Sequence, residues 1–184
     1  MKTSIQRLRH MMREAIDASP SQRLGHDVAL GGSMQQSFAD PSSSLLHALA
    51  CLRLAYLSHQ NSHWQARGEP FYADHQLYAR LYESAAKDVD SLAERIAGLF
   101  GGDTIDLGDQ VQSLLACQEC TLVMAEAGAL ERAVAVEEHA LECIEDAYDT
   151  AATSGTKTLG LDDLLMQIAS SREEAMYLLR QRTG

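Results

Sequence analysis

Two histidines flank a short turn in the middle of the chain, and two carboxylates follow on the next predicted helix. His63 lies six residues before Glu69 and His75 lies six residues after it, so in an antiparallel helical hairpin centred on this turn the two rings reach the same height. Asp90 and Glu94 lie one helical turn apart and share a face. Imidazole and carboxylate ligands suit Fe(II), and they also bind zinc. These residues therefore predict a site for a transition-metal ion.

The spacing of the same residues prevents one subunit from building this site alone. Asp90 lies 15 residues beyond His75, which is roughly 22 Å along a helix that rises 1.5 Å per residue. A two-fold dimer with antiparallel second helices brings Asp90 and Glu94 of one chain beside His63 and His75 of the other. We therefore expect a homo-oligomer whose two-fold interface forms the metal site.

The whole pattern resembles a known signature. The run His63-Trp64, ten residues, His75, fourteen residues, Asp90, three residues and Glu94 is similar to the ferroxidase signature of the Dps proteins, the mini-ferritins. The resemblance covers roughly residues 44–182. It implies a hollow shell of twelve subunits that oxidises Fe(II), with hydrogen peroxide as oxidant, and stores Fe(III). It also implies a cytoplasmic role in iron homeostasis and in protection against oxidative damage.

The resemblance assigns a role to each residue of the signature. His63, Asp90 and Glu94 would form the stronger iron site, and His75 with the bridging Glu94 would form the weaker one. Trp64, beside His63, would donate an electron during oxidation, with packing at the interface as the alternative role. All four ligands would be catalytic residues of the ferroxidase reaction.

One position departs from the family pattern. Dps proteins have a further carboxylate four residues after the second histidine, where this chain has Ala79. Glu83, one turn further along, is a candidate substitute, and His59 is a candidate extra ligand one turn before His63. The alternative function is that of a structural relative which keeps the shell, has impaired ferroxidase activity and binds zinc or no metal.

The elements that must position these residues are helical. The chain is 46% apolar and only 5% aromatic, a composition typical of helical proteins. Apolar residues recur at steps of three and four along four long stretches. We predict helices at 44–67, 72–100, 130–152 and 161–182, with a shorter helix at 111–125 in the long connection. The predicted fold is all-α, a ferritin-like four-helix bundle over residues 44–184.

Residues 1–43 are predicted to form an N-terminal helix at 4–17 and a polar arm. This segment holds the candidates for contact with DNA phosphates, namely Lys2, Arg7, Arg9 and Arg13. The chain carries a net charge of −11, which disfavours nucleic acid as a partner. A nucleoid-binding protein that acts through the arm is therefore a weaker alternative.

The start of the sequence has no apolar segment typical of a secretory signal, and we expect the protein in the cytoplasm. No apolar run approaches the roughly 20 residues that span a bilayer, so we expect no membrane partner.

The cysteines are predicted to be free thiols. Cys117 and Cys120 form a C-x-x-C pair without a second such pair or a histidine close in the sequence, and we interpret them as buried thiols. Cys51 and Cys143 are interpreted as core residues. Residues 137–139 (Glu-Glu-His) lack the repeated Glu-x-x-His spacing of a di-iron site inside a bundle, so we expect no such site.

Overall fold

The computed structural model describes residues 40–122 and 128–183. Within these residues it contains five α-helices, one 3-10 turn and no strand, which confirms the predicted all-α bundle. The elements are α2 (Pro41–Gln65), α3 (Phe71–Phe100), η2 (Gly102–Thr104), α4 (Leu107–Leu122), α5 (Ala129–Thr153) and α6 (Leu159–Thr183). The predicted helix at 4–17 and almost all of the polar arm lie outside the described residues. No described helix combines the length and the hydrophobicity of a membrane span.

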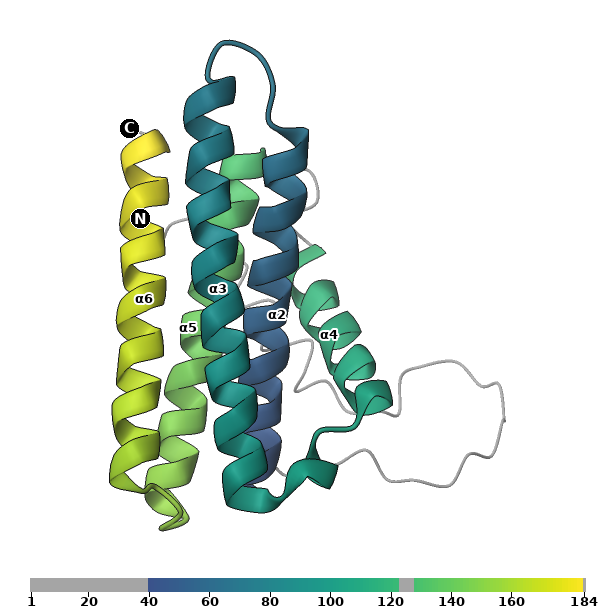
Figure 1. Ribbon diagram of the computed structural model, residues 1–184, viewed down its shortest axis with the longest axis vertical. Helices are drawn as coiled ribbons and strands as arrows, with labels where there is room; N and C mark the ends of the chain where they lie inside the picture. Colours follow the sequence, from purple (N-terminus) through teal and green to yellow (C-terminus); the bar gives the residue numbers. More distant parts are fainter. Residues whose placement is uncertain (1–39, 123–127, 184) are drawn as a thin grey trace, which may run out of the picture. The chain divides into compact units, whose positions relative to one another are not determined.

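The four helices of the bundle follow one another in a ferritin-like order (Figure 1). α2 and α3 form an antiparallel hairpin, and the connection through η2 and α4 returns the chain to the other end, so α5 runs parallel to α3. α6 then returns antiparallel to α5. α2 packs against α3, α5 and α4, and α6 packs against α5 and α3.

Local signals set the ends of the first hairpin. Asp40 caps α2, because its carboxylate accepts a hydrogen bond from the backbone N–H of Ser42 at 3.3 Å, and Pro41 follows at the first helical position. The helix therefore begins three residues before the predicted position 44. Between α2 and α3 the chain turns through Gly68, whose φ of 82° favours glycine. The predicted antiparallel pairing across this turn is confirmed.

The core is divided along the bundle axis into two apolar clusters. The larger cluster includes Leu49 of α2, Ile96 of α3 and Leu165 of α6. The smaller one includes Leu81 of α3 and Leu179 of α6. Between the two lies a layer of buried and half-buried polar side chains contributed by all four long helices. We call these residues the polar layer: His59, Ser84, Asp88, Glu137 and Arg172.

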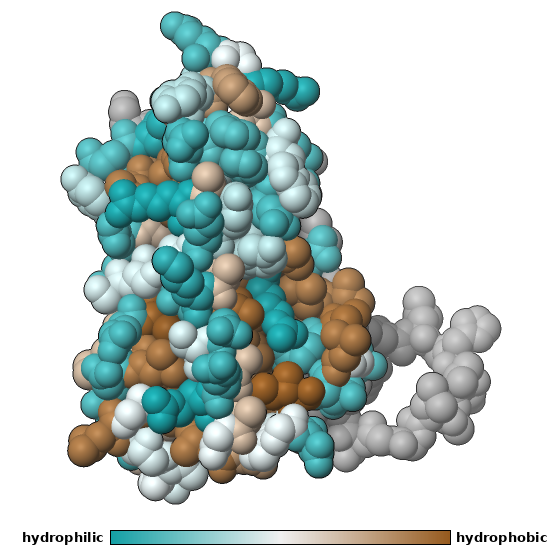
Figure 2. Space-filling model, viewed as in Figure 1, coloured by the Kyte–Doolittle hydropathy of each residue, from teal (hydrophilic) through white to brown (hydrophobic). Residues whose placement is uncertain are grey.

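α4 is attached to the bundle on one side and leaves an apolar row on the other. Gln110, which is buried, accepts a hydrogen bond from Arg53 of α2 at 3.1 Å. Leu107, Val111 and Leu115 lie four residues apart on one face and are 75%, 48% and 54% exposed. Figure 2 shows hydrophobic side chains gathered over this helix. We call these three residues the α4 apolar row.

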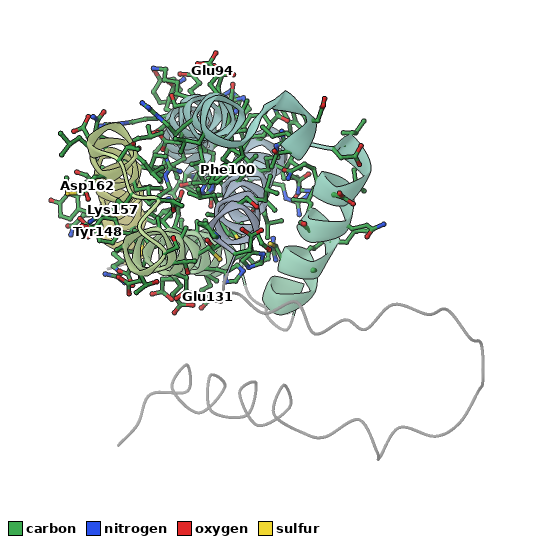
Figure 3. All side chains as sticks on the ribbon, turned by 90° about the horizontal axis from the view of Figure 1, so that it is seen from below. Glu94, Phe100, Glu131, Tyr148, Lys157 and Asp162 are labelled. Atoms are coloured by element: carbon green, nitrogen blue, oxygen red, sulfur yellow. The ribbon has the colours of Figure 1, made fainter. Side chains whose placement is uncertain are left out.

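A lysine in the turn between α5 and α6 contacts a tyrosine of α5 and an aspartate of α6 (Figure 3). Lys157 donates a hydrogen bond to the Tyr148 hydroxyl at 2.8 Å, and its ammonium lies 2.8 Å from a carboxylate oxygen of Asp162. The hydrogen bond between Lys157 and Asp162 raises the pKa of the lysine and lowers the pKa of the aspartate. These contacts connect α5 with the first turn of α6.

Candidate metal sites

His63 and His75 face each other across the α2–α3 hairpin. Their ring centroids lie 3.7 Å apart and the rings are nearly parallel, with an interplanar angle of 23°. His63 lies in the last turn of α2 and His75 in the second turn of α3. The predicted meeting of the two imidazoles is confirmed.

Backbone carbonyls determine the tautomer of both rings. The Nδ1 of His63 lies 2.8 Å from the carbonyl oxygen of His75, and the Nδ1 of His75 lies 3.1 Å from the carbonyl oxygen of His63. A carbonyl oxygen only accepts, so each Nδ1 carries the hydrogen and donates it. The neutral rings therefore keep the lone pair on Nε2, as metal-binding histidines oriented by an outer hydrogen bond do.

Aromatic neighbours hold the histidine pair in place. Tyr82 lies edge-on to His63, with centroids 5.3 Å apart, and Phe71 stacks on His75 at 5.1 Å. Both histidines remain only half-buried. Trp64, the predicted electron donor, follows His63 directly and is 68% exposed. The pair is thus rigidly oriented and still reachable from the surface.

Asp90 and Glu94 lie further along α3 and are both exposed. Figure 3 shows Glu94 on the outer side of α3, away from the other helices. The straight course of α3 keeps these carboxylates far from His75, roughly 22 Å for the 15 residues to Asp90. A single subunit therefore does not bring the four predicted ligands together, and their meeting across a dimer interface stays a prediction.

The additional candidates occupy different environments. His59 is fully buried, and its Nε2 lies 2.7 Å from Glu137 in the polar layer, so it pairs with a carboxylate inside the bundle. Glu83 is exposed on α3, and Ala79 is half-buried one turn after His75. The basic residues proposed for DNA lie outside the described residues, so that role stays a prediction: Lys2, Arg7, Arg9 and Arg13.

Inside the bundle, an arginine is the partner of a buried and a half-buried carboxylate. The Arg172 guanidinium lies 3.1 Å from Glu137 and 3.0 Å from Asp88, and it donates a hydrogen bond to Ser84 at 2.8 Å. Burial raises the pKa of Asp88, although Arg172 acts in the opposite direction. Because Glu137 is already paired with a protein cation, the arrangement agrees with the expectation that residues 137–139 form no di-iron site.

Comparison with known proteins identifies relatives of this chain. No model of a protein family matches the chain. General stress protein 20U of Bacillus subtilis is 26% identical over 133 residues, which are 70% of this chain and 87% of that protein. DNA protection during starvation protein 2 of Bacillus anthracis is 26% identical over 120 residues, or 65% of this chain and 80% of that protein.

Solved structures agree with these relatives. Dps from Thermosynechococcus elongatus has a TM-score of 0.65 and 21% identity, and the match covers 78% of this chain and 90% of that one. DpsC from Streptomyces coelicolor has a TM-score of 0.62 and 20% identity, with 89% and 95% covered. Dps from Vibrio cholerae O1, described as a ferritin-like diiron-carboxylate protein, has a TM-score of 0.63 and 15% identity, with 86% and 100% covered.

The chain has the Dps fold. The resemblance to Dps proteins that the ferroxidase signature indicated is thereby confirmed. In this Dps fold the histidine pair lies at the α2–α3 turn, and the two carboxylates lie on the same helix as the second histidine.

A second group of potential ligands in this Dps fold lies outside the signature. His47 and Cys51 of α2 meet His139 and Cys143 of α5, and one ligand atom from each lies within 4.8 Å of the others. The sulfur atoms of Cys51 and Cys143 are 2.9 Å apart. Cys117 of α4 joins them, with its sulfur 3.1 Å from that of Cys51. We call the first four residues the Cys-His cluster.

The burial predicted for Cys51, Cys117 and Cys143 is confirmed, but their surroundings were not foreseen. Cys117 was interpreted as a thiol without a histidine nearby, and its sulfur in fact lies 3.8 Å from a ring nitrogen of His47. The hydrogen bond from Cys51 lowers the pKa of both Cys117 and Cys143, and hydrogen bonds to those two thiols raise the pKa of His47. The side chain of Cys120 lies outside the described residues.

A signal for this cluster was present in the sequence. The pentapeptide His-Ala-Leu-Ala-Cys occupies positions 47–51, and His-Ala-Leu-Glu-Cys occupies positions 139–143. A spacing of four residues places histidine and cysteine on one face of each helix. The repeat becomes informative once α2 and α5 are known to pack side by side.

Proposed function

We propose that this protein is a Dps-type mini-ferritin that oxidises Fe(II) and stores the product as Fe(III) within a homo-oligomeric shell. The observation that carries the proposal is the His63–His75 pair, whose Nε2 atoms are left for a metal by hydrogen bonds at Nδ1. The Dps fold and the exposed carboxylates of the signature support it. A cytoplasmic role in iron homeostasis and protection from oxidative damage is part of the proposal, and the relatives named for stress and for DNA protection agree with it.

The proposal requires a two-fold dimer in which the α3 helices of two chains run antiparallel. That arrangement places Asp90 and Glu94 of one chain beside His63 and His75 of the other. The α4 apolar row supports self-association, because an exposed row of this kind is typical of a protein contact. Twelve subunits in a closed shell would follow from the family resemblance.

Two Fe(II) ions are the substrates at each shared site. His63 with Asp90 and Glu94 of the mate binds the first ion, and His75 with Glu94 binds the second. Two Fe(II) ions give up one electron each, and hydrogen peroxide with two protons takes up both electrons to form two water molecules. Carboxylate oxygens favour the Fe(III) product. When one Fe(II) is bound, Trp64 supplies the second electron.

The absence of a carboxylate at Ala79 weakens the second iron position. We therefore expect slower oxidation than in the variant Ala79→Asp, which restores the family pattern. The structural alternative, a shell that binds zinc or no metal at this position, predicts negligible oxidation in the natural chain. Stopped-flow oxidation of Fe(II) by peroxide in both forms separates these two functions.

The ligand assignment is tested by removing each side of the site. We expect His63→Ala and Asp90→Ala each to lower the oxidation rate at least about tenfold, since even outer partners of metal ligands account for 10- to 100-fold effects. Asp146→Ala removes an exposed carboxylate from α5 and serves as the matched control, with the natural rate expected. Natural rates in both ligand variants would exclude this site.

Mixed oligomers test whether two chains share the site. A dimer of one His63→Ala chain and one Asp90→Ala chain contains one site with both substitutions and one site with neither. Random mixing makes about half of the dimers mixed, so co-assembly restores about a quarter of the natural sites. No gain above the two parent variants would show that the ligands come from a single chain.

A further inference from the structure

We propose that His47, Cys51, His139 and Cys143 bind a structural zinc ion within each subunit, independently of the iron site. The cluster lies inside the bundle where α2 and α5 pack together. Cys51 is 12 residues from His63 on the same helix, or about 18 Å along its axis. The two sites therefore share no ligand.

The two helices contribute equivalent pairs of ligands. In each helix the histidine precedes the cysteine by four residues, so both side chains lie on one face. Because α2 and α5 are antiparallel, the histidine of one helix lies at the height of the cysteine of the other. The result is two nitrogen and two sulfur donors arranged with approximate two-fold symmetry, which is the donor set of a Cys₂His₂ zinc site.

The distances agree with tetrahedral coordination. Zinc bonds of about 2.3 Å to sulfur and 2.0–2.1 Å to nitrogen place sulfur and nitrogen about 3.6 Å apart in a tetrahedron. The Cys51 sulfur lies 3.5 Å from Nε2 of His139 and 3.8 Å from Nε2 of His47, and the Cys143 sulfur lies 3.9 Å from Nε2 of His139. The two sulfur atoms, at 2.9 Å, need to separate to about 3.8 Å, which a rotation about the Cα–Cβ bonds provides.

Charge and softness favour zinc over the other ions this protein would meet. Two thiolates and two neutral imidazoles bring a charge of −2, which Zn²⁺ cancels, and a neutral centre is tolerated at a buried position. Thiolates and imidazoles select zinc or copper(I), whereas carboxylate oxygens suit harder ions. Copper(I) would leave a net negative charge in the core, so zinc is the better match.

A disulfide explains the cluster less well. A disulfide bond between Cys51 and Cys143 would use both sulfur atoms. The two histidines of the Cys-His cluster would then lie beside sulfur atoms with which they share no ligand role. Cys117 packs against Cys51 with the two sulfurs 3.1 Å apart, and it brings α4 to the same centre. Zinc would thus connect α2 and α5 beside the helix that carries the apolar row.

Metal analysis of the full-length protein tests the proposal. The protein is purified under reducing conditions, loaded with zinc and desalted, and its zinc is measured by mass spectrometry. We expect about one tightly bound zinc per chain in the natural protein, and less than about a tenth of that in the variant Cys51→Ser/Cys143→Ser. The variant His63→Ala/His75→Ala is the matched control, since it removes two imidazoles elsewhere and is expected to keep the ion.

A second measurement keeps the test valid if the cysteine variant folds poorly. Cobalt(II) bound to the natural protein should show the thiolate charge-transfer bands and the intense visible bands of a tetrahedral site. Zinc should raise the Tm of the natural protein by roughly 8–16 °C at about a thousand times its Kd, and His47→Ala/His139→Ala should remove most of that rise.

Four outcomes would overturn the proposal. They are a natural protein without tightly bound zinc, zinc retained in folded Cys51→Ser/Cys143→Ser, zinc lost from the His63→Ala/His75→Ala control instead, and a Cys51–Cys143 disulfide or copper(I) in place of zinc. A natural protein that binds zinc as expected but does not oxidise Fe(II) would refute only the proposed function.

Discussion

Replacing Arg172 by methionine removes the cation from the polar layer while keeping much of the side-chain volume. Arg172 and Glu137 are both 0% exposed, and their charged groups lie 3.1 Å apart. Removing one partner of such a buried pair leaves an uncompensated charge and costs about 3–5 kcal/mol. For a domain of this size we expect the Tm to fall by roughly 6–20 °C.

The same helices offer a matched control. Arg80 of α3 pairs with Glu174 of α6 at the surface, where their side chains are 61% and 60% exposed. Exposed pairs of this kind contribute about 0–1 kcal/mol. Arg80→Met therefore makes the same substitution at an exposed pair that also involves α6, and it should lower the Tm by no more than about 4 °C.

Thermal unfolding followed by circular dichroism measures both variants, at one protein concentration because the proposed assembly affects the Tm. The double variant Arg172→Met/Glu137→Leu removes both charges of the fully buried pair and leaves only the half-buried Asp88 without its cation, so we expect it to recover part of the loss. Equal losses of Tm in Arg172→Met and Arg80→Met would refute the conclusion that burial makes the loss of a charged partner costly in the polar layer. A double variant with a lower Tm than Arg172→Met would refute it as well.

Three further predictions concern the ends and surfaces of helices. Lys157→Met should raise the pKa of Asp162 toward its ordinary value, as measured by NMR titration of the carboxyl group. Because the pKa of Asp162 is lowered in the folded state, the stability that this pair contributes is present above the ordinary aspartate pKa and is lost as the pH falls through the folded value. Asp40→Ala should cost about 1 kcal/mol in urea unfolding, since it removes the cap of α2, whereas Asp40→Asn should cost much less. Val111→Asp should reduce the assembly to smaller species in light scattering, and an unchanged mass would exclude the α4 apolar row from the subunit contacts.

Most of the fold could be predicted because apolar spacing and turn residues are local signals. The four long helices begin and end within three residues of the predicted bounds. The pairing of His63 with His75 follows from counting outward from the turn, and ring contacts such as Tyr56 with Tyr82 keep the same register further along the hairpin. The start of α2 was missed by three residues because the cap at Asp40 was not considered.

The polar layer could not be predicted from the same signals. His59, Asp88, Glu137 and Arg172 come from four different helices, and their common height depends on the register between α2–α3 and α5–α6. That register is set by the connection through α4 and by core packing, neither of which is local in sequence. Each residue alone was compatible with an exposed polar position or, for His59, with a metal ligand.

The proposed zinc site at the Cys-His cluster and the proposed iron site differ in the burial and the chemical softness of their ligands. A substrate ion must enter and leave, so its ligands are best placed at half-buried or exposed positions, as His63 and Asp90 are. A structural ion needs no exchange, and buried cysteines such as Cys51 and Cys143 suit a softer ion at a position that water does not reach. The harder, more exposed ligands thus favour turnover of iron, and the softer, buried ligands favour retention of zinc. Because Cys51 and His63 lie roughly 18 Å apart along α2, one chain can carry both sites without exchange of ions between them.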